Sequence, residues 1–126
     1  MVQSVQLFEL AAQQARWLAA RQSAIAGNIA NVNTPGYGTM EIEPFERVLD
    51  NSHRVSIGST AANHIPIGGS GSFGMRAGGE PSLLPSENSV VLENELIKSG
   101  EVRRAFDLNT AIVKSFHRMM MMNTKV

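Results

Sequence analysis

The histidines are the residues of this sequence best suited to metal binding or proton transfer, and there are three of them: His53, His64 and His117. Zinc sites on helices pair ligands at short spacings such as His-x-x-x-His, and no such spacing is present. The chain also contains no cysteine, which excludes thiolate metal sites and disulfide bonds. We therefore expect surface or interface histidines and no metal or other cofactor.

Other groups capable of chemistry are equally poorly placed for it. Acidic and basic residues alternate over positions 93–104, where Glu101 and Arg104 have the spacing of a surface ion pair on a helix. A catalytic pair of carboxylates needs a pocket that separates their pKa values, and the pattern predicts no such pocket. The glycine-rich stretch 68–72 lacks the Lys-Ser/Thr of a phosphate loop. The methionines at 119–122 would point around most of a helix, which suits adaptable packing better than a metal site. We predict no catalytic residue, no small-molecule substrate and no enzymatic activity.

The bulk composition excludes two further classes of partner. Lys+Arg and Asp+Glu each number 11, so the formal net charge is zero, and the longest basic tract is the pair at 103–104. Nucleic acid binding normally needs a basic patch, so none is expected. No apolar run approaches the roughly 18 residues of a membrane span. The N-terminus has neither the basic nor the apolar region of a secretory signal peptide.

The first thirty or so residues predict a long helix with an apolar seam. Apolar residues recur there at alternating spacings of three and four, interrupted at Gln22, which is the pattern of helices that pack lengthwise. Ser4 is the expected N-cap. Gly27 costs about 1 kcal/mol relative to alanine, and either a close approach of another helix or ordinary sequence drift would explain it. The seam residues are Phe8, Ala11, Ala15, Leu18, Ile25, Ile29 and Val32.

The last forty residues carry a second, similar seam. We expect that helix to begin after a cap at Asn88 or Ser89, with Ser99-Gly100 marking a close crossing or a slight bend. Its apolar surface is broad enough to contact more than one neighbour. The predicted packing residues are Leu92, Leu96, Val102, Phe106, Ile112 or Val113, Phe116, and Met119 or Met120.

Between these helices the composition changes. A short apolar group follows Pro44 and is expected to fold back on a long helix, while seven of the eleven glycines fall within 51–86. We predict a mainly α fold with four parts: an N-terminal helix and turn (1–37), a fold-back segment (38–50), a flexible Gly/Ser-rich loop (51–86) and a C-terminal helix (87–126). The two helices leave apolar flanks open, so we expect a coiled-coil-like bundle with neighbouring subunits.

The sharpest local signal lies where the first helix must end. Asn28 and Asn31 share one helix face, and their amides can satisfy the last carbonyls of that helix or fix the register of a neighbour. Pro35-Gly36 suits the centre of a type II turn, with glycine at the position of positive φ. On physical grounds alone, an ordinary helix end followed by a turn is favoured. The motif residues are Asn28, Ile29, Ala30, Asn31, Thr34, Pro35, Gly36 and Tyr37.

This ten-residue stretch, Asn-Ile-Ala-Asn-Val-Asn-Thr-Pro-Gly-Tyr, resembles the N-terminal signature of bacterial flagellar axial proteins, the rod, hook and hook-associated subunits. The resemblance extends through 40–46 and resumes at 88–96, where Val91 stands in place of the family's frequent Asp. It covers about 75 residues at the two ends and leaves the middle unmatched. The short length and the acidic segment containing Pro-Phe are most similar to a proximal rod protein.

The resemblance implies a structural subunit that polymerises through its terminal helices into a torque-transmitting shaft around an export channel. Implied partners are copies of itself, rod proteins like FlgC, FlgF and FlgG, a FliE-like adaptor, the membrane ring at the rod base and the flagellar type III export apparatus. It also implies a place in the periplasmic rod, reached without a cleaved signal peptide. The alternatives are another proximal rod protein of the FlgC type and a soluble coiled-coil adaptor.

Overall fold

A computed structural model describes residues 2–52, 73–78 and 86–124. The elements are α1 (Val2–Ala30), β1 (Met40–Ile42), α2 (Phe45–Ser52), β2 (Met75–Ala77) and α3 (Leu92–Thr124). The prediction of a mainly helical chain with two long terminal helices is confirmed. Most of the predicted flexible loop, residues 53–72 and 79–85, lies outside the described residues.

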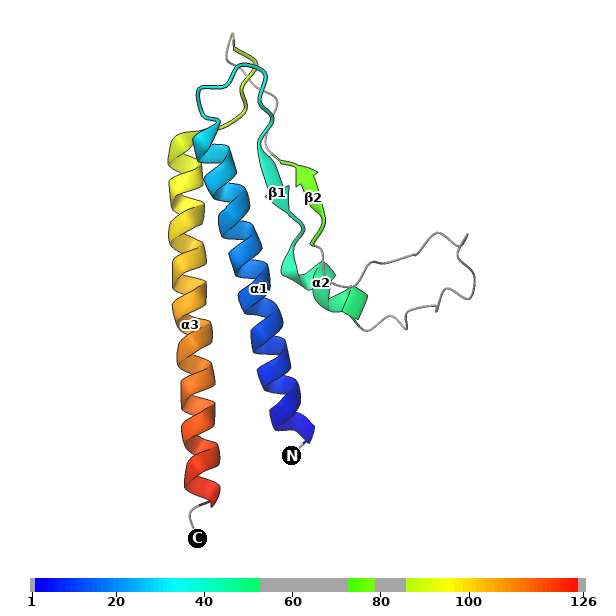
Figure 1. The fold of residues 1–126 in the computed structure, drawn as a ribbon, viewed down its shortest axis with the longest axis vertical. Helices are drawn as coiled ribbons and strands as arrows, with labels where there is room; N and C mark the ends of the chain where they lie inside the picture. The colour runs from blue at the N-terminus through cyan, green and yellow to red at the C-terminus, as the bar shows by residue number, and fades with distance from the viewer. Residues whose placement is uncertain (1, 53–72, 79–85, 125–126) are drawn as a thin grey trace, which may run out of the picture.

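The two long helices form an antiparallel pair. In Figure 1 both termini lie at the same end of the molecule, and the chain turns back at the other end, where α1 finishes and α3 starts. At 1.5 Å per residue, the 29 residues of α1 and the 33 of α3 correspond to about 43 and 50 Å. The end of α3 therefore extends beyond the start of α1, as Figure 1 shows.

Both helix starts differ from the prediction. α1 already begins at Val2, so Ser4 lies inside the helix and is not its N-cap. α3 begins at Leu92, and its first helical hydrogen bond runs from the Glu95 N–H to the Val91 carbonyl. The Asn88 side chain instead accepts from the Val90 N–H at 2.8 Å, which turns the chain before the helix starts.

The interface between the long helices contains little apolar core. Its buried centre is Leu18, Ile25 and Val102, with Trp17, Ile29 and Ala105 packed around it. Near the termini, the rings of Phe8 and Phe116 meet edge to face at 5.6 Å. Gly27 and Gly100 do not mark a close crossing within the chain, because a Cβ at either position would meet nothing within 4 Å. No helix of the same chain therefore approaches Gly27 closely within the described residues.

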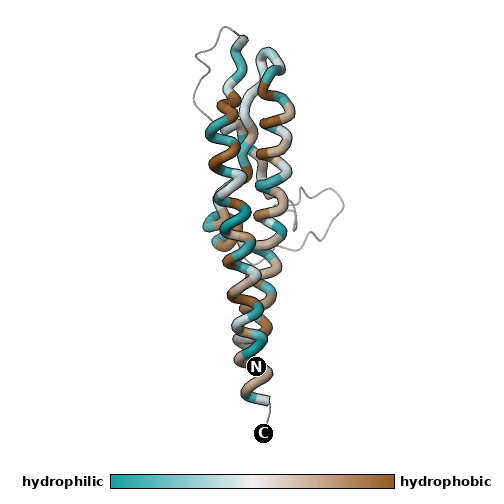
Figure 2. Tube along the Cα trace, turned by 90° about the vertical axis from the view of Figure 1, so that its left-hand side faces the viewer, coloured by the Kyte–Doolittle hydropathy of each residue, from teal (hydrophilic) through white to brown (hydrophobic). Residues whose placement is uncertain are grey.

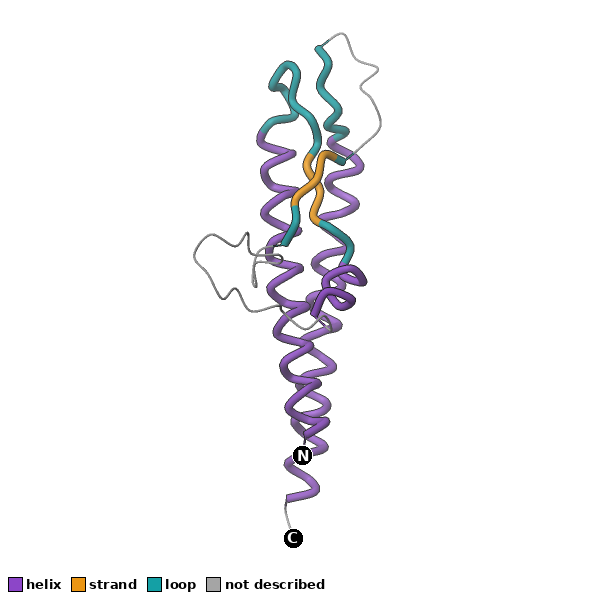
Figure 3. Tube along the Cα trace, turned by 90° about the vertical axis from the view of Figure 1, so that its right-hand side faces the viewer, coloured by secondary structure: helices purple, strands orange, loops and turns teal. Residues whose placement is uncertain are grey.

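A small antiparallel sheet lies along the helix pair. Met40 pairs with Ala77, Glu41 with Arg76 and Ile42 with Met75, and Figure 3 shows the two strands in front of the helices. β2 falls within the segment predicted to be irregular. It escapes sequence analysis because its three residues are all exposed, show no alternation, and owe their strand geometry to backbone bonds with a distant segment.

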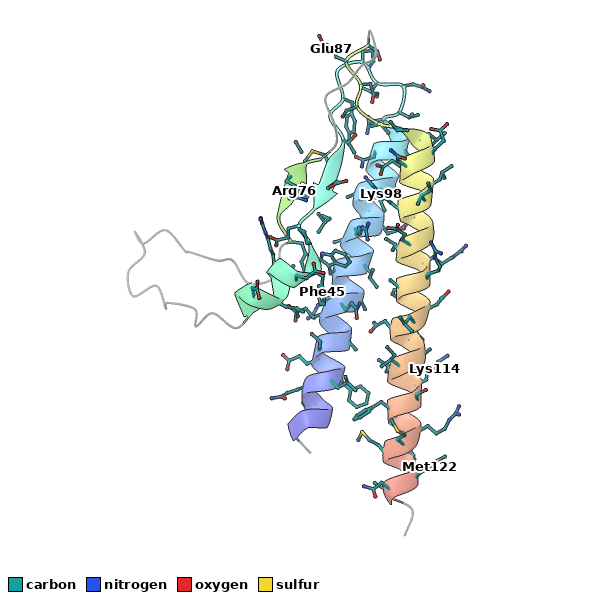
Figure 4. The ribbon with its side chains drawn as sticks, turned by 180° about the vertical axis from the view of Figure 1, so that it is seen from behind. Phe45, Arg76, Glu87, Lys98, Lys114 and Met122 are labelled. Carbon is teal, nitrogen blue, oxygen red and sulfur yellow. The ribbon has the colours of Figure 1, made fainter. Side chains whose placement is uncertain are left out.

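The fold-back segment after Pro44 is the helix α2. Figure 4 labels Phe45 beside α1, where its ring lies 5.5 Å from the ring of Trp17. The Trp17 indole N–H donates to the Glu43 carbonyl at 2.9 Å, and Val48 is buried. One aromatic anchor therefore attaches both the end of β1 and the start of α2 to the middle of α1.

Candidate subunit interface

The turn after α1 has the geometry expected from its sequence. Gly36 has a φ of +72°, and the Tyr37 N–H donates to the Thr34 carbonyl at 3.3 Å, as in a type II turn centred on Pro35-Gly36. The Gly36 N–H also donates to the Ser86 carbonyl at 2.8 Å. Thr34, Pro35 and Gly36 are exposed, so this turn forms the tip of the helix pair.

Asn28 joins three parts of the fold and is only 1% exposed. Its side-chain NH₂ donates to the Met40 carbonyl at 2.9 Å and to the Glu95 carboxylate at 3.0 Å. Its oxygen accepts from the Met40 N–H at 2.9 Å and from the Tyr37 hydroxyl at 3.4 Å. Asn28 therefore acts as an extra strand partner for β1 while fixing the register of α3. Of the two roles considered for Asn28, binding the last carbonyls of its own helix is therefore not the one observed.

Asn31 and Asn88 hold together the turn after α1 and the segment before α3, at the tip of the helix pair. Asn31 donates to the Gly27 carbonyl of its own helix at 2.8 Å, as the ordinary helix-end interpretation expects. The buried Asn88 amide donates to the carbonyls of Asn31, Val32 and Thr34 at 2.8–3.0 Å. Asn88 thus binds three carbonyls of the turn that follows α1, and it does so from the segment that leads into α3.

A buried carboxylate connects the same region to α3. Glu95 is 1% exposed, and Lys98 donates to it at 3.0 Å and to Glu41 of β1 at 2.7 Å. The hydrogen bond from Lys98 lowers the pKa of Glu41 despite partial burial. Burial by itself would lower the pKa of Lys98, but its hydrogen bonds to Glu41 and Glu95 outweigh this and raise it. Lys98 thus joins Glu41 of β1 to Glu95 of α3 and holds the strand against that helix.

The stripe predicted for the C-terminal helix included the polar position Asn109, but sequence analysis missed Glu95 as part of the seam. Both are buried at seven-residue intervals from Val102, and the Asn109 side chain donates to the Ala11 carbonyl at 3.1 Å. The spacing was a usable signal, but a polar side chain at a seam position looks like an interruption when only apolar residues are counted. The predicted ion pair of Glu101 with Arg104 is not formed, because Glu101 pairs with Arg21 of α1 at 3.3 Å.

The predicted packing residues divide between the interior and the surface. Ala11, Leu18, Ile25 and Val102 are buried. Ala15, Val32, Val113 and Met120 are half-buried. On α3, however, Leu92, Leu96, Phe106 and Ile112 are 38–56% exposed. Ile97, Leu108 and Met119 on the same helix are 59–62% exposed. Figure 2 shows brown, apolar positions along α3 that are interspersed with polar ones. The structure therefore turns several predicted seam residues away from α1.

A groove accompanies this exposed surface. It has a volume of ≈ 570 Å³ and lies between α1 and α3, where Leu18, Val102, Phe106, Ser99 and Gly100 are among the residues that line it. A second hollow lies between α1 and the strands, and Lys98 and Arg76 are among the residues that line it. Figure 4 labels Lys98 where α3 faces α1.

The described residues contain no group of three or more histidine, cysteine or acidic side chains placed to hold a metal. His117 is exposed on α3, while His53 and His64 lie outside the described residues. Over the part of the chain that is described, neither long helix has an apolar stretch sufficient to span a bilayer. What the arrangement offers is a rigid pair of helices with open apolar flanks, suited to packing against other helices.

Two comparisons with known proteins bear on this arrangement. The family model described as "Flagella basal body rod protein" matches residues 10–37, which include most of α1 and the turn after it. The chain is also 43% identical to the "Flagellar basal body rod protein FlgB" of Agrobacterium fabrum (strain C58). That alignment covers 98% of this chain and 96% of the relative, so it includes both helices and the middle segment.

Proposed function

This chain belongs to the family of flagellar basal body rod proteins, and we propose that it is a structural subunit of the proximal rod that works by polymerising through α1 and α3. The observation that carries the proposal is the likeness to a rod protein over nearly the whole chain. The exposed apolar residues of α3 support it, because a protein that works alone rarely leaves such surface uncovered.

The geometry suits a load-bearing part. Helices packed lengthwise resist bending and twisting, because close-packed interiors deform little. The Asn28–Glu95–Lys98 network adds fixed register between α1, β1 and α3, so that load on one helix passes to the other without slippage. In this proposal torque crosses many contacts between subunits, none of them catalytic, and the subunits enclose the channel through which later components are exported.

The proposed partners are copies of this chain, FlgC-, FlgF- and FlgG-like rod proteins, and a FliE-like adaptor with the membrane ring at the base. The proposed location is the periplasmic part of the basal body, reached through the flagellar type III apparatus without a cleaved signal peptide. These assignments rest on membership in the rod family. No observation favours the FlgC type over the FlgB type for this chain.

Deletion of the gene with complementation by the full chain tests the proposal. We expect the deletion strain to be non-motile, its basal bodies to lack a rod, and the full chain to restore both. A motile deletion strain with intact rods would refute the function. As a matched control, the exposed Arg47→Glu on α2 is expected to complement fully, since Arg47 forms none of the ion pairs among the described residues.

A soluble coiled-coil adaptor is the alternative from another class of protein. A reporter fused to the N-terminus separates the two, because a rod subunit is secreted only when the flagellar export apparatus is present and an adaptor stays inside the cell. Sedimentation and circular dichroism of the isolated chain give a further check. A compact monomer that melts cooperatively and exposes no apolar surface would count against a polymerising subunit.

A further inference from the structure

Four consecutive methionines, residues 119–122, lie near the C-terminal end of α3. Figure 4 labels Met122 there, at one end of the helix pair. The chain contains no cysteine, so the thioether sulfurs of its seven methionines are its only sulfur atoms open to oxidation. Four of the seven therefore stand next to one another at one place in the fold.

The phase of the helix exposes three of these side chains and shelters the fourth. Val102 packs against α1, and Met120 lies 18 positions further along, since 120 − 102 = 18. Eighteen residues make about five turns at 3.6 residues per turn, so Met120 points to the same side of α3 as Val102. Met120 is accordingly half-buried, whereas Met119, Met121 and Met122 are 50–67% exposed.

Two methionines outside α3 provide a comparison. Met75 on β2 is 55% exposed, within the range of the three exposed methionines of α3. Met40 on β1 is half-buried like Met120, and its backbone is bound by the Asn28 amide at 2.9 Å. The methionines of the described residues thus divide into an exposed set and a sheltered set, and each set has members both on α3 and on a strand.

Exposed thioethers react with peroxides without help from another side chain. A lone pair on the sulfur attacks one oxygen of hydrogen peroxide, the O–O bond breaks, and the proton of the attacked oxygen passes to the departing hydroxide. The products are a sulfoxide and water, so the sulfur loses the two electrons that the peroxide gains. The sulfoxide is polar where the thioether was apolar and flexible, which changes the surface that the side chain presents.

We infer that Met119, Met121 and Met122 form a peroxide-sensitive modification site at the end of α3, and that Met120 in the same run is protected by its position on the side facing α1. The buried centre of the described fold contains none of these residues, so three sulfoxides make this end of the molecule polar without unfolding the helix pair. Because the sulfoxides stand in solvent, a methionine sulfoxide reductase can reach them and reverse the modification. The inference goes beyond the proposed function and does not depend on it.

Brief treatment of the full chain with hydrogen peroxide, followed by trypsin digestion and tandem mass spectrometry, tests this selectivity. Trypsin cleaves after Arg118 and Lys125, so all four methionines of the run fall in one peptide and are compared within the same molecule. We expect the three exposed methionines of the run, and Met75, to be oxidised at least about threefold faster than Met120 and Met40.

The same chain unfolded in urea is the matched control, because the neighbouring residues are unchanged while the helix is lost. There the four oxidation rates are expected to agree within about twofold. After oxidation in the folded state, the urea midpoint is expected to stay unchanged, and treatment with methionine sulfoxide reductases should restore the original mass. Combining Met119→Leu, Met121→Leu and Met122→Leu should leave no rapidly oxidised residue in this peptide.

Oxidation of Met120 in the folded chain as fast as that of Met122 would overturn the inference. A selectivity that persists in urea would also overturn it, since the difference would then come from the sequence and not from the fold. Loss of the helical circular dichroism signal on oxidation would show that the run stabilises the helix pair, contrary to the inference. All of these measurements use the isolated chain, so a deletion strain that keeps its rods would refute the proposed function and leave the modification site in place.

Discussion

Replacing Asn28 with aspartate tests whether the buried network sets the register of the fold. The side-chain NH₂ of Asn28 lies 3.0 Å from the Glu95 carboxylate and 2.9 Å from the Met40 carbonyl. Aspartate is almost the same shape, but it places a carboxylate oxygen where the NH₂ donates. Two buried carboxylates would then face each other at about hydrogen-bond distance.

Asn28→Asp is expected to lower the free energy of unfolding by a large amount for a chain with a small core. At 3.0 Å and an effective dielectric constant of about 20, two unit charges repel by about 5–6 kcal/mol. Asn28→Ala, by comparison, removes partners from Met40 and Glu95 without adding a charge, and costs on the order of 3 kcal/mol. We therefore expect Asn28→Asp to be clearly less stable than Asn28→Ala at pH 8.

Protonation of one of the two facing carboxylates limits their repulsion, so the stability of the Asn28→Asp variant depends on pH in a distinctive way. A proton shared by the new carboxyl pair raises its pKa in the folded state above the roughly 3.9 of an unfolded aspartate. The folded state then binds more protons, so the stability of the variant rises as the pH falls and is lost as the pH rises. At about 1.4 kcal/mol per pH unit, the variant regains about 4 kcal/mol between pH 8 and pH 5.

Urea unfolding followed by circular dichroism at pH 8 and pH 5 measures these differences. Glu95→Gln is the matched partner, because it removes the second carboxylate while keeping its shape and offers an NH₂ to the aspartate. We expect Asn28→Asp with Glu95→Gln to recover most of the loss and to show little change between the two pH values. Equal stabilities of Asn28→Asp and Asn28→Ala at pH 8, or no gain at pH 5, would refute the assigned network.

Three further predictions concern the strand region and the glycines. Because the pKa of Glu41 is lowered in the folded state, its stabilising pairing with Lys98 is present above about pH 4.5 and is lost as the pH falls through the folded pKa. The raised pKa of Lys98 preserves the same pairing up to at least pH 10.5. Glu41→Gln should remove this acid-dependent loss in a pH series of unfolding curves, and an unchanged series would contradict the pairing. Gly27→Ala should stabilise the isolated chain by about 0.5–1 kcal/mol, because the added methyl group meets nothing within 4 Å and helix propensity rises. Gly78→Ala should destabilise it by about 1–3 kcal/mol, because its Cβ would overlap the Glu41 side chain, and thermal melting of the two alanine variants must therefore shift in opposite directions.

The sequence predicts the long elements and the turn well because their signals are local. The recurrence of apolar residues indicates both helices, and Pro35-Gly36 by itself requires the turn with glycine at positive φ. The start of α3 was placed too early because Asn88 looks like a helix cap. In the structure its amide is occupied by the carbonyls at the end of α1, a contact between segments more than fifty residues apart that no local pattern contains.

The face that α3 turns towards α1 was harder to predict for a related reason. Apolar residues surround much of α3, so the hydrophobic pattern alone does not select one face. The structure selects the face that contains Glu95 and Asn109, whose side chains bind Asn28 and the Ala11 carbonyl. Hydrogen bonds are directional and costly to leave unmade, so these polar residues decide between faces of similar hydrophobicity.

This distribution reverses the usual plan of a helical hairpin, which buries its largest apolar residues and exposes its polar ones. Here Asn28, Glu95 and Asn109 are buried between the helices while Leu96, Phe106 and Leu108 are 46–62% exposed. The contact within the chain thus has high geometric specificity and a modest apolar area, while most of the apolar area of α3 is left for contacts between chains. A subunit built this way has its register fixed before it meets a neighbour. The larger hydrophobic contribution to free energy comes only when the neighbour arrives, which favours association over persistence as a free monomer.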